Sequence, residues 1–304
     1  MGVAHLLQQF HADNTSGATT LAERAVDLLT VFATHAPDSP AFHSALATLI
    51  REMLAAQPSM AVLLNLAQQA LQVCPSDVAV ETARVQLHQA LTTFRQQLHQ
   101  STKAICQRLC TVLPPHATVL TYSNSTTVTA ALQYAFDHGQ VHRVFVSESR
   151  PAYDGRLQAQ ALARHGIPVE YSIDMALFEH LQEAQVLLIG ADAVFPHGLV
   201  NKLGTRALVH MAQLHHLPVY SLCAANKFLP ADAAPLLHIA EHPGYEVWPE
   251  APTTVQVHNH YFDTTPLTLF TGIISDLALY APTILALELQ RLTLAPALQQ
   301  LVSR

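Results

Sequence analysis

The sequence predicts an α/β protein in which an N-terminal helical bundle precedes a Rossmann-like domain built on a parallel sheet. Three observations support this fold class. Apolar residues recur at helical spacing in the first part of the chain, short β-rich runs alternate with helical stretches in the second part, and the prolines of LPPH at 113–116 separate the two patterns. We therefore expect a helical domain over residues 1–115 and a Rossmann-like α/β domain with the ligand pocket over residues 116–304.

The first part of the chain shows the apolar periodicity of amphipathic helices. The spacing predicts three helices around Leu21–Phe32, Phe42–Met53 and Leu63–Leu71, and a longer one from Val80 to Val112. Pro114 and Pro115 end the last helix because a helix interior cannot accommodate proline. We interpret the apolar stripes as the core of a bundle.

The second part of the chain contains five β-rich runs, which predict strands at 118–123, 143–149, 168–174, 186–194 and 218–224. A helical stretch of about ten residues follows each of the first four runs. This alternation is typical of a parallel sheet that carries helices on both faces. Gly139, Gly166 and Gly204 mark the ends or starts of these helices.

The composition argues against several kinds of partner. Half of the 304 residues are hydrophobic, 12% are charged, the net charge is -7, and no Lys/Arg cluster is interleaved with aromatic residues. We therefore expect no direct binding of nucleic acid. The apolar runs are shorter than the roughly 18 to 20 residues of a membrane span, and the first residues lack a signal-peptide pattern. We expect no membrane association and a cytoplasmic location.

Cysteine and histidine usage predicts neither a disulfide framework nor a metal site. The four cysteines show no CxxC spacing, and the 19 histidines include no HExxH motif. Free thiols in a reducing compartment, no metal and no cofactor are the expected state.

Polar side chains follow the predicted strands, and open α/β sheets bind ligands at the carboxyl ends of their strands. Hydroxyl and amide groups at the start of a helix favour an anion, because the free N–H groups and the helix dipole act together there. Asp192 directly follows LLIGA, where a carboxylate needs a partner or a shifted pKa. We expect a pocket for a small phosphorylated ligand, formed by Ser123, Asn124, Ser125, Arg150, Asp192, Asn201, Lys202 and Lys227.

Several of these residues also have a purely structural interpretation. The segment 123–125 can cap the helix that follows it. Arg150 can pair with Glu148 or Asp154 in a surface ion pair that contributes about 0 to 1 kcal/mol. Asn201 can cap the next helix of the chain. The spacing alone leaves both interpretations open.

The longest motifs resemble a known family. They are VFVSESRPAYDGRLQAQALARHGIPVEY, LLIGADAVFPHGLVNKLGT, PVYSLCAANKF and YFDTTPLTLFTGIISD. The chain resembles the family of the α, β and δ subunits of eukaryotic translation initiation factor 2B, which also includes the isomerases of methylthioribose 1-phosphate and ribose 1,5-bisphosphate. DNTSGATTLAERAVDLL and MLAAQPSMAVLLNLAQQAL resemble its helical domain, so the resemblance covers nearly the whole chain.

The resemblance implies roles for individual residues. In the isomerases, a cysteine after the first strand and the aspartate of a Gly-Ala-Asp motif move a proton between two carbons of the sugar. The aspartate corresponds to Asp192, the Asn-Lys pair that contacts the phosphate to Asn201 and Lys202, and a later lysine to Lys227. Ser123 stands at the position of the cysteine, and NTSGAT at 14–19 stands roughly where the isomerases have an Arg-Gly-Ala phosphate motif.

The serine decides between two functions. A thiol can be tuned to exchange a proton near neutral pH, whereas a serine hydroxyl is too weak an acid without a dedicated base. Cys223 is a possible substitute thiol, although a buried structural role fits it as well. We therefore expect a family member that binds a sugar phosphate or nucleotide without the Cys/Asp isomerase chemistry.

The alternative is an aldose-ketose isomerase acting on a phosphorylated ribose, of the ribose-1,5-bisphosphate or methylthioribose-1-phosphate type. Asp192 would be its general acid/base, and Ser123 would position the substrate. The family also implies a homodimer that forms through the α/β domain, and its initiation-factor members work through contacts with partner subunits.

Overall fold

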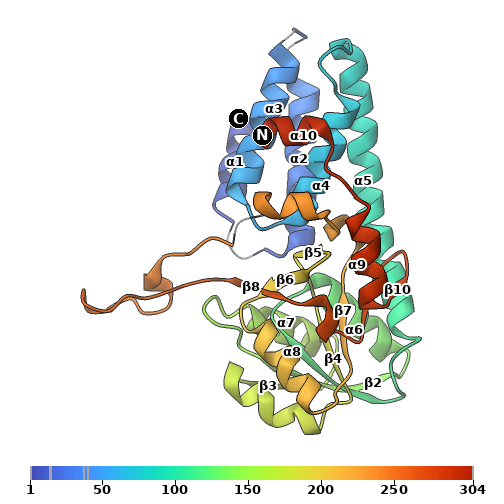
Figure 1. Cartoon of the computed structure of the whole chain (residues 1–304), viewed down its shortest axis with the longest axis vertical. Helices are drawn as coiled ribbons and strands as arrows, with labels where there is room; N and C mark the ends of the chain where they lie inside the picture. The colour runs from blue at the N-terminus through green and yellow to red at the C-terminus, as the bar shows by residue number, and fades with distance from the viewer. Residues whose placement is uncertain (1, 14–15, 37, 40, 238, 303–304) are drawn as a thin grey trace.

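A computed structural model describes residues 2–13, 16–36, 38–39, 41–237 and 239–302. Figure 1 shows an elongated molecule with a helical part at one end and an α/β part at the other. Residues 14 and 15 lie outside the described residues, and with them the start of the segment that stands in place of the Arg-Gly-Ala motif.

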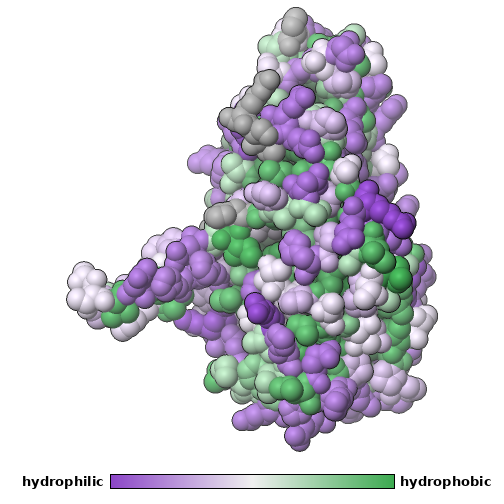
Figure 2. All heavy atoms as spheres, viewed as in Figure 1, coloured by the Kyte–Doolittle hydropathy of each residue, from purple (hydrophilic) through white to green (hydrophobic). Residues whose placement is uncertain are grey.

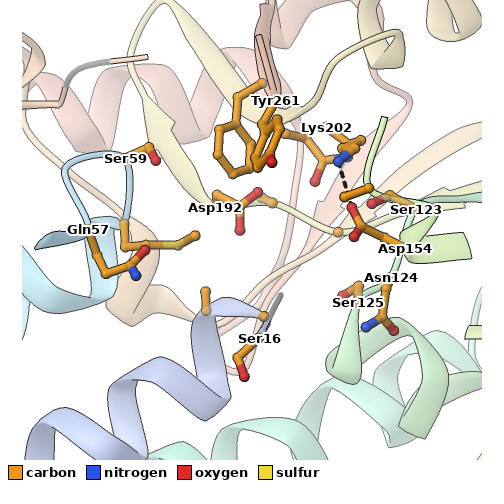
Figure 3. A pocket seen from close by; sticks show the side chains of 18 of the residues that line it. Ser16, Gln57, Ser59, Ser123, Asn124, Ser125, Asp154, Asp192, Lys202 and Tyr261 are labelled. Carbon is orange, nitrogen blue, oxygen red and sulfur yellow. Dashed lines mark ion pairs between the residues drawn. The ribbon is translucent and has the colours of Figure 1, made fainter. Parts of the chain in front are cut away.

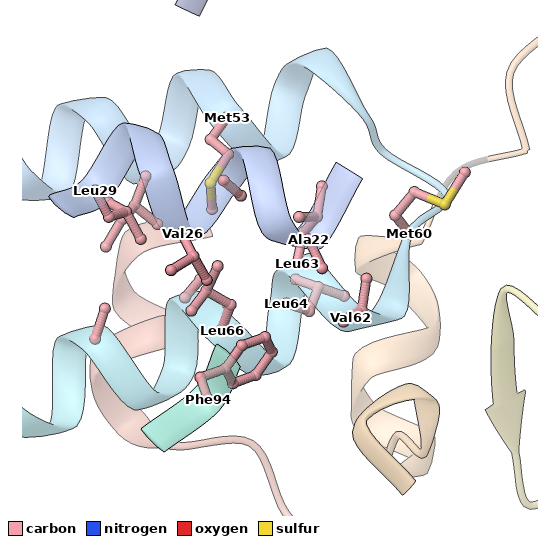
Figure 4. Close-up of a cluster of buried hydrophobic side chains, with 14 of the residues drawn as sticks. Ala22, Val26, Leu29, Met53, Met60, Val62, Leu63, Leu64, Leu66 and Phe94 are labelled. Carbon is pink, nitrogen blue, oxygen red and sulfur yellow. The ribbon is translucent and has the colours of Figure 1, made fainter. Parts of the chain in front are cut away.

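The helical part confirms the expected bundle. Its helices are α1 (Val3–His11), α2 (Ala18–His35), α3 (Ala41–Ala56), α4 (Ala61–Val73) and α5 (Val80–Leu109). Apolar side chains from α2, α3, α4 and α5 interdigitate in one core (Figure 4), in which Val26, Met53 and Phe94 are almost completely buried. The 3.6-residue period of the sequence predicted these faces because residues that recur at this spacing lie on one side of a helix.

The α/β part confirms a mostly parallel sheet. Its strand order is β10-β9-β7-β4-β1-β2-β3, and all neighbours run parallel except β10 and β9. The strands are β1 (Ala117–Tyr122), β2 (Val141–Ser147), β3 (Val169–Ser172), β4 (Val186–Ile189), β7 (Val219–Leu222), β9 (Gly272–Ile274) and β10 (Leu279–Tyr280).

Helices cover both faces of this sheet. Alternate residues of a strand point to opposite faces, and in β4 Leu187 and Ile189 join one core while Val186 and Leu188 join the other. The first core includes α8 (Thr205–Leu214) and α9 (Pro282–Gln290), and the second includes α6 (Thr126–Asp137) and α7 (Asp154–Arg164). The C-terminal turns of α5 also belong to the second core, so this helix connects the two parts of the molecule (Figure 1).

Two elements differ from the prediction. The run 186–194 is not one strand, because the chain leaves the main sheet after β4 and continues as β5 (Ala193–Phe195). β5 forms a separate antiparallel sheet with β6 (Gly198–Lys202) and β8 (Phe262–Thr265). The stretch after β3 forms a 3-10 helix, Asp174–Gln182, instead of an α-helix.

The C-terminal helix returns to the helical part. α10 (Pro296–Val302) contacts α3 and α4, and Leu294, Leu298 and Leu301 belong to the same core as the bundle. Residues 240–260 form an arm that extends away from the body and is mostly hydrophilic (Figures 1 and 2). Among the described helices, none is both long and apolar enough to cross a membrane.

Candidate functional site

A cavity lies between the helical part and the carboxyl edge of the sheet (Figure 3). The helical part contributes Asp13, residues 16–18 and residues 56–60 to its wall, and the arm contributes residues near its two ends. The sheet side contributes seven of the eight predicted site residues, which are Ser123, Asn124, Ser125, Asp192, Asn201, Lys202 and Lys227. The strand ends therefore converge as the topology required.

Arg150 is the predicted site residue that does not line this cavity. Its backbone N–H donates to Asp174 at 2.8 Å, and its guanidinium donates to the Val247 carbonyl at 3.1 Å and to the Tyr153 hydroxyl. Within the described residues, Arg150 forms no ion pair with Glu148 or Asp154, so the alternative of a surface ion pair is not realised either. Arg150 therefore ties the end of β2 to the arm.

The turn after β1 caps the helix that follows it and also lines the cavity. Ser125 is the N-cap of α6, and its hydroxyl accepts from the Val128 N–H at 3.3 Å. Ser123 has a left-handed backbone with φ of 67°, and its N–H donates to the Ser149 hydroxyl at 2.9 Å. Because the first N–H groups of a helix lack acceptors within it, the start of α6 presents donors suited to an anion at the cavity wall.

Gly190 lets the end of β4 approach this turn. A Cβ at Gly190 would lie 2.7 Å from the hydroxyl oxygen and 2.8 Å from the Cβ of Ser125. Any larger residue would push the cap of α6 away from the strand. Close packing against Ser125 therefore requires glycine at position 190.

Asp192 is anchored by its backbone and faces the cavity with its carboxylate (Figure 3). Its N–H donates to the Val200 carbonyl at 2.8 Å, and its carbonyl accepts from the Ala61 N–H at 3.3 Å. Within the described part of the chain, its carboxylate has neither a hydrogen bond nor an ion pair. Burial raises the pKa of Asp192, although Lys227 and Lys202 act in the opposite direction. A carboxyl with a raised pKa can hold and release a proton closer to neutral pH.

The two lysines of the cavity are both buried but have different partners. Lys227 donates to the Ala191 carbonyl at 2.5 Å. Lys202 forms an ion pair with Asp154 at 2.6 Å, and its ammonium lies 4.8 Å from the centre of the Tyr261 ring. The predicted Asn-Lys pair is therefore in place, with Lys202 already neutralised by a carboxylate.

Asn201 lies on β6 and braces the start of α8. Its side-chain amide donates to the Thr205 hydroxyl at 2.9 Å, which in turn donates to the Lys202 carbonyl at 2.6 Å. Gly204 is the N-cap residue of α8, so Asn201 does not cap this helix itself.

Sequence reasoning missed the cavity residues at the two ends of the arm, His242 within it and Tyr261 directly after it. The rings of His242 and Tyr261 stack at 3.6 Å with an angle of 7°, and the Tyr261 hydroxyl donates to Glu246 at 2.5 Å. Burial is the main cause that lowers the pKa of His242, which makes a neutral imidazole the main form at pH 7. The arm carries no periodic pattern that would place it beside the sheet.

Sequence reasoning also missed Asp154 as a cavity residue. Its signal was its position in the quoted motif VFVSESRPAYDG, at the start of a predicted helix. The helical-part wall, with Gln57 and Ser59, left no comparable signal, because it depends on how distant segments pack.

Cys223 does not act as a substitute thiol in this arrangement. It is completely buried outside the cavity lining, and burial raises the pKa of its thiol to about 12. No cluster of three His, Cys, Asp or Glu residues that could hold a metal ion occurs within the described residues.

The sequence is similar to that of several known proteins. The sequence model of the initiation factor 2 subunit family matches residues 14–282. A ribose 1,5-bisphosphate isomerase of Methanocaldococcus jannaschii is 31% identical over 169 residues, which cover 54% of this chain and 55% of that protein. This chain therefore spans about half the length of that relative.

Two other relatives match over most of their length. A putative translation initiation factor eIF-2B subunit 2-like protein of Pyrococcus furiosus is 26% identical, with 92% of this chain and 96% of that protein covered. A methylthioribose-1-phosphate isomerase of Klebsiella pneumoniae is 28% identical, with 92% and 86% covered.

Solved structures show the same fold. The translation initiation factor eIF-2B of Pyrococcus horikoshii OT3 superposes with a TM-score of 0.81 at 25% identity, over 92% of this chain and 97% of that one. The 5-methylthioribose 1-phosphate isomerase of the same organism gives a TM-score of 0.76 at 20% identity, over 99% and 88% of the two chains.

Proposed function

The chain belongs to the initiation factor 2 subunit family, and we propose that its cavity binds a phosphorylated sugar or nucleotide without the family's cysteine–aspartate isomerase chemistry. The observation that carries the proposal is the composition of one cavity wall. The lining combines the start of α6 at Ser125 with Lys227 and Asp192. Helix N–H groups and a lysine suit a phosphoryl group, and a carboxylate suits the hydroxyl groups of a sugar.

The residues at the position of the reactive group support binding rather than isomerisation. The resemblance assigns the isomerase cysteine to Ser123, and no cysteine lines the cavity among the described residues. A serine needs an adjacent base to become reactive. The Ser123 N–H is held by Ser149, whereas no hydrogen-bonded base is found for its hydroxyl in the described part of the chain.

The test separates binding from turnover. The purified protein is incubated with ribose 1,5-bisphosphate and with methylthioribose 1-phosphate, and both the melting temperature and the ketose product are measured. A ligand at 100 times its Kd stabilises the native state by about 2.7 kcal/mol, so binding is visible as a clear rise in Tm. We expect a rise in Tm without ketose. A protein that gains no stability from either sugar phosphate would contradict the pocket assignment.

A second candidate function is aldose-ketose isomerisation, and the unpaired carboxylate of Asp192 favours it. Burial raises the pKa of Asp192, and a carboxyl group with a raised pKa that lines the cavity suits general acid/base catalysis. If ketose forms, Asp192→Asn abolishes it and the exposed control Asp137→Asn does not. Turnover with this pattern would replace the binding-only proposal.

We also propose the homodimer as the working assembly, formed through the α/β part. Hydrophobic side chains gather over α9 and β10 (Figure 2), where Leu279, Ile284 and Leu287 are exposed. Exposed apolar patches often mark protein interfaces. Sedimentation is expected to show a dimer that Leu287→Glu weakens and that the control Leu214→Glu, at a still more exposed leucine, leaves intact; a wild-type monomer would refute the assembly.

A further inference from the structure

We infer that Asp154 sets the charge selectivity of the cavity, so that it accepts a ligand with a single phosphoryl group and an uncharged far end. This inference rests on the proposed binding of a phosphorylated ligand. The sequence analysis assigned no ligand-binding role to Asp154. The inference predicts that this residue makes the cavity prefer singly to doubly phosphorylated ligands.

The first step is the state of Lys202. Its ammonium is held by the Asp154 carboxylate at 2.6 Å, and the two side chains are only 5% and 18% exposed. The ring of Tyr261 lies on the same ammonium. An ion pair shielded from water keeps much of its attraction, so Lys202 offers little charge to a ligand while Asp154 is present.

The second step is the charge balance of the lining. Two ammonium groups, Lys202 and Lys227, face two carboxylates, Asp154 and Asp192. Lys227 and the start of α6 are then the positive features that remain for a ligand. A phosphate monoester carries a charge of about -1.5 to -2 at pH 7. Lys227 and the start of α6 can meet one such group, whereas a second group finds no free ammonium among the described lining residues.

The third step is the far wall, which the helical part provides. Ser16 to Ala18 and Gln57 to Met60 are uncharged, and Ser16, Gln57 and Ser59 bring polar side chains to this side (Figure 3). Asp13, the acidic residue among the described residues of this wall, pairs with Arg24 and accepts from the Ser16 N–H at 3.0 Å. This wall can bind hydroxyl groups or a neutral substituent, and its described residues offer no free counter-charge to a second phosphoryl group.

The experiment measures Kd by titration calorimetry for ribose 1-phosphate, ribose 5-phosphate and ribose 1,5-bisphosphate. The wild-type protein is expected to bind at least one monophosphate about tenfold more tightly than the bisphosphate, since the second phosphoryl group would leave water without gaining a counter-charge. In Asp154→Asn the freed Lys202 is expected to lower the Kd of the bisphosphate about tenfold more than that of the monophosphate. Asp154→Glu retains the charge and is expected to keep the wild-type preference.

The matched control is Asp137→Asn, which makes the same change in net charge at an exposed position of α6. Circular dichroism establishes that each variant is folded. If Asp154→Asn does not fold, the test of the charge is whether Asp154→Glu keeps the wild-type preference for the monophosphate. Equal wild-type affinity for mono- and bisphosphate, or equal effects of Asp154→Asn and Asp137→Asn, would overturn the inference and leave the binding proposal standing. Absence of binding by all three sugars would overturn both.

Discussion

Gly190→Ala tests whether the site depends on the close approach of β4 to the cap of α6. The added Cβ would lie 2.7 Å from the Ser125 hydroxyl and 2.8 Å from its Cβ, a separation that real Cβ atoms do not tolerate. If Ser125 rotates away, α6 loses its N-cap bond, which costs about 1 kcal/mol. Overpacking of the remaining contact costs about 1 to 3 kcal/mol. We expect a loss of about 2 to 4 kcal/mol in the free energy of unfolding.

Urea unfolding followed by circular dichroism measures this loss, and a second substitution tests its cause. Ser125→Gly removes the hydroxyl oxygen and the Cβ of Ser125, the two atoms that lie too close to the new Cβ. Glycine at an N-cap costs only a few tenths of a kcal/mol. The double variant is therefore expected to recover most of the stability. Gly2→Ala, which has no neighbour within 4 Å of the new Cβ, is the control. A double variant no more stable than Gly190→Ala, or a single variant within about 0.5 kcal/mol of wild type, would refute this reasoning.

Three further changes test the pH dependence, the turn and the C-terminal packing. Burial raises the pKa of Asp192 above its ordinary 3.8, so the carboxyl group holds its proton more tightly in the native state than in the unfolded chain. The free energy of unfolding therefore falls as the pH rises from about 3.8 through the pKa of the native state. Asp192→Asn is expected to be more stable than wild type at neutral pH, with a difference that vanishes as urea unfolding is repeated at pH values falling to about 4; a constant difference would contradict the shift. Tyr122→Phe leaves the Leu203 carbonyl, now bonded at 2.6 Å, without its donor and is expected to cost about 1 to 3 kcal/mol in the same assay. Leu298→Ala in α10 empties a fully buried position and is expected to cost about 2 to 5 kcal/mol, whereas the exposed Leu292→Ala costs less; equal effects would mean that α10 does not stabilise the bundle.

The sequence predicted the regular elements well because local periodicity reports burial. Phe94 and Leu87 on α5 recur at the helical period, and both are buried in the bundle core. Val144 and Val146 on β2 are buried in the same core of the sheet, as strand alternation requires. Periodicity is a property of each segment alone, so it can be read before the partner segments are known.

The sequence did not predict where the chain changes sheets. The run from Val186 to Val194 gives no sign in its β-rich composition that the chain leaves the main sheet between Ile189 and Ala193. Gly190 lies against Ser125, more than sixty positions earlier in the chain, and this contact is visible only in the folded structure. α10 escaped prediction for a similar reason. Its seven residues are too few to show a clear period, and its place is set by contacts with α3 and α4.

For the candidate site, the sequence by itself placed Ser123, Asp192 and Lys227 on one edge, because parallel strands end on the same side of a sheet. Only the tertiary structure decided which charges meet there. It paired Lys202 with Asp154 and closed the cavity with residues 56–60 of the helical part. Such pairings depend on distances between segments far apart in the chain, and those distances exist only once the chain has folded.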